Sequence, residues 1–410
     1  MKTRFTFLFF LALGHCLLCP LAVSTVGAQS VRFQPQQLDA SPGRVVYAVA
    51  AADIDNDGRT DAVAVTEDSV VWYQAPRWRK RVLLSGVTAR DNVCIAPYDI
   101  DRNGRIDLAL GAGWPKNGGT IQWLSPGDSI DAPWNVHEIS AEPWTHRMRW
   151  GNVLGSDEPQ LVVSPLNASI REGVRLLAFS IPPNPHNDRW RPTVLDASLD
   201  RLHNHLCVER TAIGFAPIPP GDATANQEIT LTASAAGISA ILPDSKDPGR
   251  FRRVDLLPGA EGEEPNARGA GEVRTGMLKS GQPFIATIEP MHGTHAVVYK
   301  MGEFFAAEAP ERTVLTDDLR GGHALACADI DGDGSDEVIV GYREPNPRVG
   351  ILLFDHQPDG TWREQRIGSE VACEDLVVAD FNADGRLDIL AGGRATHNVV
   401  LYVNQGPATP

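Results

Sequence analysis

The chain has 410 residues, of which 52 are acidic and 37 are Lys or Arg, so its formal net charge is −15 at pH 7. Such a surface repels the phosphate backbone of nucleic acids and anionic lipid headgroups, and we expect neither as a partner. A chain of this length can bury its own hydrophobic core and needs no disulfide bonds to fold.

The N-terminal segment has the pattern of a signal peptide. Lys2 and Arg4 precede an apolar run over residues 7–23, and Val26 and Ala28 provide small side chains before a cleavage point. This predicts a signal peptide over residues 1–28 and a secreted or periplasmic mature chain. A membrane anchor is the weaker interpretation because the run is short, so we expect no membrane insertion after cleavage. The sequence does not indicate the oligomeric state.

Four copies of one unit stand out along the chain. Each copy has an apolar stretch, an acidic loop and a β-branched stretch: AADIDNDGRTDAVAV from 51, PYDIDRNGRIDLALG from 97, CADIDGDGSDEVIVG from 327 and VADFNADGRLDILAG from 378. Alternation and composition favour strands on both sides of the loop.

An aromatic residue begins an outer-strand pattern in each unit, at intervals of roughly 45 to 60 residues, the length of one four-stranded propeller blade. We therefore predict an all-β fold, a seven-bladed β-propeller that forms a single domain over residues 29–410. In three central blades the loops have lost most of their acids. The marking aromatic residues are Phe33, Trp78, Trp134, Trp190, Phe251, Trp362 and, as the weakest match, Phe305.

The two ends of the chain are expected to complete one blade together. The sequence starts with an outer-strand pattern, VRFQPQQLD from 31, and ends with an inner one, NVVLYVNQG from 398. Pairing the two would close the ring and remove exposed sheet edges.

The acidic loops follow the pattern D-x-[DN]-x-D-G, with oxygen-bearing side chains at positions 1, 3, 5 and 9 and a glycine that permits a sharp turn. Hard oxygen ligands with this spacing suit Ca²⁺, so we predict structural calcium ions. The expected ligands are Asp53, Asp55, Asp57, Asp61, Asp99, Asp101, Asn103, Asp107, Asp329, Asp331, Asp333, Glu337, Asp380, Asn382, Asp384 and Asp388.

Two other interpretations of these loops are weaker. An EF-hand needs flanking helices and a bidentate Glu at position 12, which the sequence lacks. Turns rich in Asp and Gly also form without metal, but several acids packed together would repel one another unless a cation lay between them.

The four cysteines after the expected cleavage point have no zinc-finger spacing. The repeat pattern places Cys94, Cys207, Cys327 and Cys373 in four different blades. We therefore expect buried free thiols.

A second set of polar residues lies six positions before each acidic loop. This register is expected on the innermost strands, near one mouth of the central channel. Two residues further on, His205 and Glu272 should share the same strand face. The register, with Ala270 assigned to the fifth blade, consists of Tyr47, Val93, His146, His203, Ala270, His323 and Glu374.

Convergent imidazole and carboxylate groups allow two functional interpretations. They could bind a transition metal such as Zn²⁺, or supply general acid and base groups. Singly, each histidine would be interpreted as a hydrogen-bonded residue of a watery channel. His292 and His295 could add to the rim, and Trp114, Trp144 and Trp150 could stack on sugar rings.

The acidic loops resemble FG-GAP or VCBS repeats, as found in integrin-type propellers. A closer resemblance, to the propeller of the aldos-2-ulose dehydratase family, lies in several other segments. They are THRMRWGNV from 145, LDRLHNH from 199, GAGEV from 269, FIATIEPMHGTHAVVY from 284 and GGHALACADIDGDGSDEVIVGYR from 321.

This resemblance implies bound divalent cations and β-elimination of water from a keto-sugar such as anhydrofructose, or from a keto-glycoside. It also implies a site made by His146, His203, His205, Glu272 and His323. The family's cupin domain has no counterpart before Pro410, so we do not expect its isomerase step. The alternative function is a non-catalytic FG-GAP propeller that binds glycans or proteins at the cell surface. A purely structural exported protein is the third possibility.

Overall fold

The computed structural model describes residues 30–115, 119–169, 173–215, 224, 227–244, 247, 249–264, 266–302, 310–345 and 348–408. The expected signal peptide and Phe305 lie outside these residues. Among the helices of the described part, none has both the length and the apolar character needed to cross a membrane.

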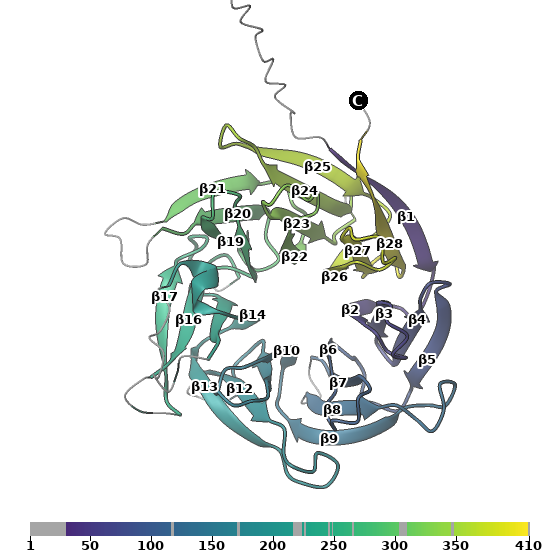
Figure 1. The fold of residues 1–410 in the computed structure, drawn as a ribbon. Coiled ribbons are helices and arrows are strands. Elements are labelled where there is room, and N and C mark those ends of the chain that lie inside the picture. The colour runs from purple at the N-terminus through teal and green to yellow at the C-terminus, as the bar shows by residue number, and fades with distance from the viewer. Residues whose placement is uncertain are drawn as a thin grey trace, which may run out of the picture.

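Seven four-stranded antiparallel sheets surround a central axis, which confirms the predicted seven-bladed propeller (Figure 1). We number the blades along the chain. Blade 1 contains β2(Val46–Ala52), β3(Asp61–Thr66), β4(Ser69–Gln74) and β5(Arg79–Ser85); blade 2 contains β6(Cys94–Tyr98), β7(Asp107–Ala112), β8(Thr120–Ser125) and β9(Asn135–Ala141); blade 3 contains β10(Thr145–Gly151), β11(Gln160–Pro165), β12(Val174–Ser180) and β13(Arg191–Leu199).

The remaining blades follow the same order from the axis outward, except that the last takes its outer strand from the start of the chain. Blade 4 contains β14(Leu202–Val208), β15(Ile229–Ser234), β16(Gly237–Pro243) and β17(Phe251–Leu257), with the short 3-10 helix η1(Arg210–Ile213); blade 5 contains β18(Glu272–Met277), β19(Pro283–Glu289), β20(His295–Lys300) and β21(Glu311–Thr316); blade 6 contains β22(Gly322–Ala328), β23(Glu337–Tyr342), β24(Gly350–His356) and β25(Trp362–Gly368); blade 7 contains β26(Cys373–Ala379), β27(Asp388–Gly393), β28(Val399–Pro407) and β1(Val31–Asp39).

Position within a blade decides the composition of a strand. The second strand packs against both neighbouring blades, so β3, with the sequence DAVAVT, is buried at every residue. The outermost strand β5 faces solvent with most of its length and is mainly polar. Continuous apolar runs therefore mark the middle of each blade, and mixed ones mark its edge.

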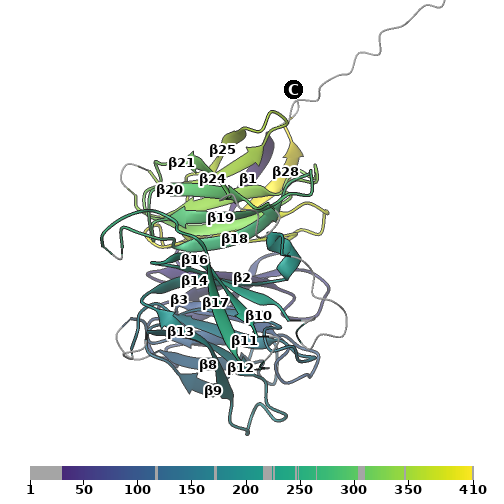
Figure 2. The ribbon, with the colours of Figure 1, turned by 90° about the vertical axis from the view of Figure 1, so that its left-hand side faces the viewer.

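The two ends of the chain complete blade 7, as predicted. Strand β1 pairs antiparallel with β28, from Val31 opposite Pro407 to Asp39 opposite Val399. Both views show these strands side by side (Figures 1 and 2). The NVVLYVNQG segment forms the third strand from the axis, and the innermost strand of this blade is β26. The pairing closes the ring without an open sheet edge between the first and last blades.

Five of the seven innermost strands carry a register shift that leaves one residue without a paired partner. A bulge of this kind re-aims a side chain and increases the local twist. The unpaired residues belong to the register predicted from the repeats: Tyr47, His146, His203, His323 and Glu374.

The four cysteines lie on four different innermost strands, β6, β14, β22 and β26, and all are free thiols, as predicted. Cys94 and Cys373 are buried, whereas the other two residues are partly exposed. Burial raises the pKa of the Cys94 and Cys207 thiols to about 12, so both remain protonated at neutral pH.

Candidate functional site

Each innermost strand connects two chemically different ends of the molecule. It begins near the bulge at one mouth of the channel and ends at the acidic loop, or its degenerate equivalent, at the other. Six residues of extended strand separate the two positions, a distance of about 20 Å. The bulges and the acidic loops therefore form two separate groups of polar residues.

In the acidic loops, carboxylates bind backbone N–H groups of their own turn. Asp53 accepts bonds from the N–H groups of Asp57, at 3.0 Å, and Gly58, at 2.8 Å. Asp61 is 1% exposed and accepts bonds from Ile54 and Ala75. The loops starting at Asp99, Asp329 and Asp380 repeat this arrangement.

These contacts leave several carboxylate oxygens unsatisfied. The described residues offer no hydrogen-bond partner to buried oxygens of Asp55, Asp107, Asp329 and Glu337. Burial, together with neighbouring carboxylates, raises the pKa of Asp61 to about 6, of Asp107 to about 7 and of Glu337 to about 9. Crowded, buried oxygens without donors are what a bound cation would satisfy.

In each of three of the four loops, three carboxylates place one oxygen atom each within 4.8 Å of the other two. These groups are Asp53, Asp55 and Asp57; Asp99, Asp101 and Asp107; and Asp329, Asp331 and Asp333.

The third strand of a blade also reaches the loop, which the loop motif alone did not indicate. In blade 6, Asp355 on β24 forms a further group of this kind with Asp331 and Glu337. In blade 1, the Gln74 amide at the end of β4 donates to Asp55. Blade 6 therefore has the densest carboxylate cluster.

At the other mouth, the bulge histidines bind the backbone of the next blade in a regular way. The Nδ1 atom of His146 lies 2.9 Å from the carbonyl oxygen of His203. The Nδ1 atom of His203 lies 2.7 Å from that of Gly271, and the Nδ1 atom of His323 lies 2.5 Å from that of Glu374. Because a carbonyl only accepts, each Nδ1 carries the proton and each Nε2 keeps its lone pair.

This pattern corrects the register of the fifth blade. Gly271 accepts the bond that bulge residues accept in blades 4 and 7, so it holds the position assigned to Ala270 from the sequence. Blade 5 connects its first two strands with a shorter loop than the intact blades have. Counting back six residues from that loop in the sequence therefore pointed to a position one residue too early.

The bulge histidines meet a fourth imidazole. His292, in the loop between β19 and β20, has its Nε2 atom 2.8 Å from Nε2 of His203. Its ring centroid lies 4.9 Å from that of His323, and the centroid of His146 lies 4.8 Å from that of His203. We call His146, His203, His292 and His323 the axial histidine cluster.

The cluster is held in place by charged neighbours. Glu272 lies 3.2 Å from Nδ1 of His203 and accepts a bond from the Asn204 amide. Arg343 donates to Glu374 at 2.6 Å and lies 3.3 Å from Nδ1 of His292. A donor on Nδ1 requires that the proton of His292 be on Nε2, directed at His203.

Burial dominates the protonation of this cluster. It lowers the pKa of all four histidines, and neighbouring arginines lower it further, whereas the bond and charge of Glu272 partly oppose this for His203. Burial alone would raise the pKa of Glu272, but its bond and charge interaction with His203 leave that pKa below its usual value. At neutral pH the cluster therefore contains neutral imidazoles beside an ionised carboxylate.

His205 lies apart from this cluster. Its Nδ1 atom lies 2.8 Å from the hydroxyl of Ser164, which belongs to the preceding blade, and the residue is fully buried. The bulge at His203 interrupts the strand alternation, so the two histidines do not share a face as the simple two-residue period predicts.

The remaining candidates lie around the rim. Trp114 packs 4.9 Å from His146 and 5.7 Å from Trp144, between ring centroids. Trp150 donates its indole N–H to the carbonyl of Ala96. His295 interacts with the adjacent Thr294. Of these residues, Trp114 packs against the cluster and Trp144 packs on Trp114.

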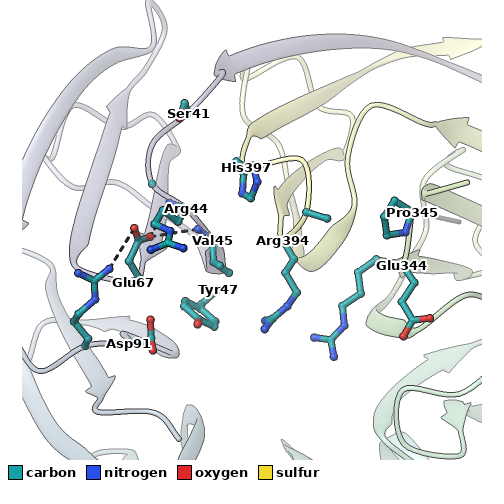
Figure 3. Close-up of a pocket in the computed structure, with 14 residues that line it drawn as sticks. Ser41, Arg44, Val45, Tyr47, Glu67, Asp91, Glu344, Pro345, Arg394 and His397 are labelled. Carbon is teal, nitrogen blue, oxygen red and sulfur yellow. Dashed lines mark hydrogen bonds and ion pairs between the residues drawn. The ribbon is translucent and has the colours of Figure 1, made fainter.

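A cavity of about 1170 Å³ adjoins the cluster between blades 1, 2, 6 and 7 (Figure 3). Tyr47, the bulge residue of blade 1, lies on its wall, and burial together with Asp91 raises its pKa to about 12. Arg343 and Arg394 line the cavity and both bind Glu374, the bulge residue of blade 7. These two arginines connect the cavity to the histidines.

Sequence reasoning did not identify Arg343, Arg394 and Glu67 as part of this site. All three directly follow the second strand of a blade, at the mouth where the innermost strands begin. That position in each repeat is a signal that could have found them.

Comparison with known proteins gives two family matches. Residues 118–301 match the family model described as the β-propeller domain of aldos-2-ulose dehydratase, and residues 329–391 match an FG-GAP-like repeat. A curated relative, aldos-2-ulose dehydratase from Phanerodontia chrysosporium, is 25% identical over 317 residues, which cover 70% of this chain and 34% of the relative. The predicted resemblance is confirmed.

The two matches cover different parts of the chain, and both leave out His323 and the acidic loops of blades 1 and 2. The dehydratase propeller match includes His146, His203, Glu272 and His292, whereas the FG-GAP match includes the acidic loops of blades 6 and 7. This chain spans about a third of the length of the curated dehydratase.

A solved structure shares the fold. It is the extracellular domain of a hybrid two-component system from B. thetaiotaomicron, with a TM-score of 0.50 and 12% identity, and the match covers 91% of this chain and 40% of that one. At this identity the likeness concerns the propeller architecture alone.

Proposed function

We propose that this chain is an exported carbohydrate-active lyase that removes water from a keto-sugar by β-elimination. The main support is the fixed tautomer of three bulge histidines, whose Nδ1–H groups donate hydrogen bonds to backbone carbonyls of the next blade. Nε2 of His203 accepts the N–H of His292, and Nε2 of His146 lies 3.3 Å from a guanidinium nitrogen of Arg147. The Nε2 lone pair of His323 is therefore the one that we assign as a base, beside a cavity large enough for a saccharide.

The elimination needs a base, stabilisation of negative charge and a proton donor. The neutral imidazole of His323, whose Nδ1 bonds to the carbonyl of Glu374, takes the proton from the carbon next to the ketone. Arg343 and Arg394 supply positive charge near the resulting enolate. Tyr47, protonated at neutral pH, gives its proton to the departing hydroxyl, which leaves as water.

A divalent transition metal fits the same cluster. Ligand nitrogens of His203, His292 and His323 lie within 4.8 Å of one another, and three imidazoles form a common zinc ligand set. When bound there, such a metal would polarise the ketone of the substrate. The protein orients these rings through the backbone carbonyls and Arg343.

We further propose that the acidic loops bind structural Ca²⁺. The buried oxygens without donors and the raised carboxyl pKa values both support this assignment. The cations would neutralise part of the negative charge of the chain. They would also stabilise the loops at the end of the channel opposite the histidines.

The test is incubation of the metal-replete protein with 1,5-anhydrofructose and 3-keto-glycosides, followed by the ultraviolet absorbance of an enone product. We expect growth of absorbance that a His203→Ala/His323→Ala variant loses. A folded protein that gives no product with any of these sugars would contradict the proposal. It would favour a non-catalytic propeller that binds glycans or proteins at the cell surface, which the FG-GAP match supports.

A further inference from the structure

We propose that the cavity beside the histidine cluster binds an acidic saccharide, with Arg44 as the residue that meets its carboxylate. This inference rests on the proposed function in taking a carbohydrate as the ligand. It goes further by assigning the charge and the length of that carbohydrate.

The first observation is the sign of charge around the cavity. The chain as a whole carries −15, yet four arginines line this one space: Arg44, Arg90, Arg343 and Arg394. The acidic lining residues are Glu67, Asp91 and Glu344. On a strongly acidic protein, a concentration of guanidinium groups at one cavity favours an anionic ligand.

The second observation is which of these arginines already have partners. Arg343 and Arg394 bind Glu374 at 2.6 and 2.8 Å. Arg90 lies 3.7 Å from Glu67. Arg44 also lines the cavity, but its side chain forms no ion pair with any described residue (Figure 3).

Glu67 bonds to the backbone of Arg44 and forms no ion pair with its side chain. One of its oxygens accepts the N–H of Arg44 at 2.8 Å and the N–H of Val45 at 3.3 Å. The guanidinium of Arg44 therefore keeps its donors for a ligand. A guanidinium recognises a carboxylate through two parallel hydrogen bonds, a geometry that Lys cannot reproduce.

The third observation is size. A volume of about 1170 Å³ exceeds the roughly 300–1,000 Å³ of ordinary small-molecule pockets. One sugar ring would leave most of it to water. A saccharide of two or more units could extend from Arg44 past Tyr47 to Arg343, which contacts His292.

The experiment is calorimetric titration of the folded, calcium-loaded protein with a trimer of galacturonic acid and with its neutral galactose counterpart. The variants are Arg44→Gln, Arg44→Lys and the control Arg252→Gln, which changes an exposed arginine on the outer strand β17. Melting curves establish that each variant is folded. Equilibrium binding is measured without turnover, so failure of the elimination assay would not affect this result.

We expect the acidic trimer to bind at least about tenfold more tightly than the neutral one at low salt, with affinity falling as salt rises. Arg44→Gln should lower the affinity for the acidic trimer about tenfold, and Arg44→Lys should lower it less. Arg252→Gln should leave this affinity unchanged. Equal binding of the two trimers, no binding of the acidic one, or full affinity in Arg44→Gln would each overturn the proposal.

Discussion

Blades 1, 2, 6 and 7 differ from blades 3, 4 and 5 in where they keep their polar residues. The first group has intact acidic loops at one mouth, whereas blades 3, 4 and 5 have lost them. Three of the four cluster histidines, His146, His203 and His292, come from the blades without acidic loops. Only blade 6 supplies both an acidic loop and a cluster histidine, His323.

A degenerate loop can keep the same turn without charge. In blade 3, the Gln160 side chain accepts the N–H of Leu154 at 2.7 Å, much as Asp61 accepts that of Ile54 in blade 1. An amide satisfies the backbone donor as a carboxylate does, but it adds no negative charge. We infer that the residues of the acidic loop and the bulge residue of the same repeat can change independently, because the innermost strand holds them at opposite ends of the channel.

The largest expected effect is on turnover. His292→Ala should lower kcat/KM by about 10²- to 10⁴-fold, the range for loss of a positioned base, because His292 bonds to His203 and packs beside His323, so that its loss displaces both rings. His137→Gln, on the outer strand β9, is the matched control and should remain within about twofold. Steady-state rates of enone formation would measure both.

The structure places His205 apart from the axial histidine cluster, so His205→Asn should reduce turnover much less than His292→Ala. An equally large effect of the two substitutions would contradict that separation. His205 would then have to act through Ser164 and the interface between blades. Melting curves of both variants separate a change in turnover from loss of folded protein.

The architecture could be predicted because its signals are local and repeated. The seven repeated units, the aromatic markers of six outer strands, the pairing of the two ends and the separate cysteines all follow from periodic patterns in the chain. The bulge register was found for the same reason. In five blades its members are the unpaired residues of the innermost strand.

The site could be predicted only in part because its contacts cross between blades. His292 and Arg343 lie in loops, where no strand period fixes a position. The misplacement of His205 arose from the bulge itself, since one extra residue reverses the alternation that a regular strand would have. Asp355 reaches its loop from the third strand of its blade, far from the motif in sequence.

The second expected effect tests the acidic loops as cation sites. Chelation should lower the melting temperature by several degrees, and added calcium should restore it, because a ligand of the folded state stabilises it by mass action. Differential scanning calorimetry with and without a chelator measures this change. An unchanged melting curve would mean that the loops are polar turns that need no metal.

The third expected effect is the pH dependence of the chelated protein. The pKa of Asp107 is raised to about 7 and that of Glu337 to about 9 in the folded chain. A carboxyl group with a raised folded pKa favours folding below its unfolded pKa, and this contribution is lost as pH rises through the folded value. The melting temperature of the chelated protein should therefore fall between pH 5 and pH 9.

Calcium should reverse much of that loss, since a bound cation compensates the ionised carboxylates. The difference in melting temperature between loaded and chelated protein should widen as pH rises. Two parallel curves would contradict the assignment of these carboxylates as ligands.

The smallest expected effect distinguishes blade 6 from the other intact blades. Asp355→Asn should weaken one calcium site about tenfold and leave the rest unchanged, because among the described residues blade 6 alone adds a carboxylate from its third strand. Asp355 also pairs with Arg363 at 2.6 Å, so Arg363→Gln is the control that removes the ion pair and keeps the carboxylate. If calorimetric titration with calcium gave the same loss in both variants, Asp355 would act through Arg363 and not as a ligand. A loss confined to Asp355→Asn would establish that a third strand can extend the metal site of a propeller loop.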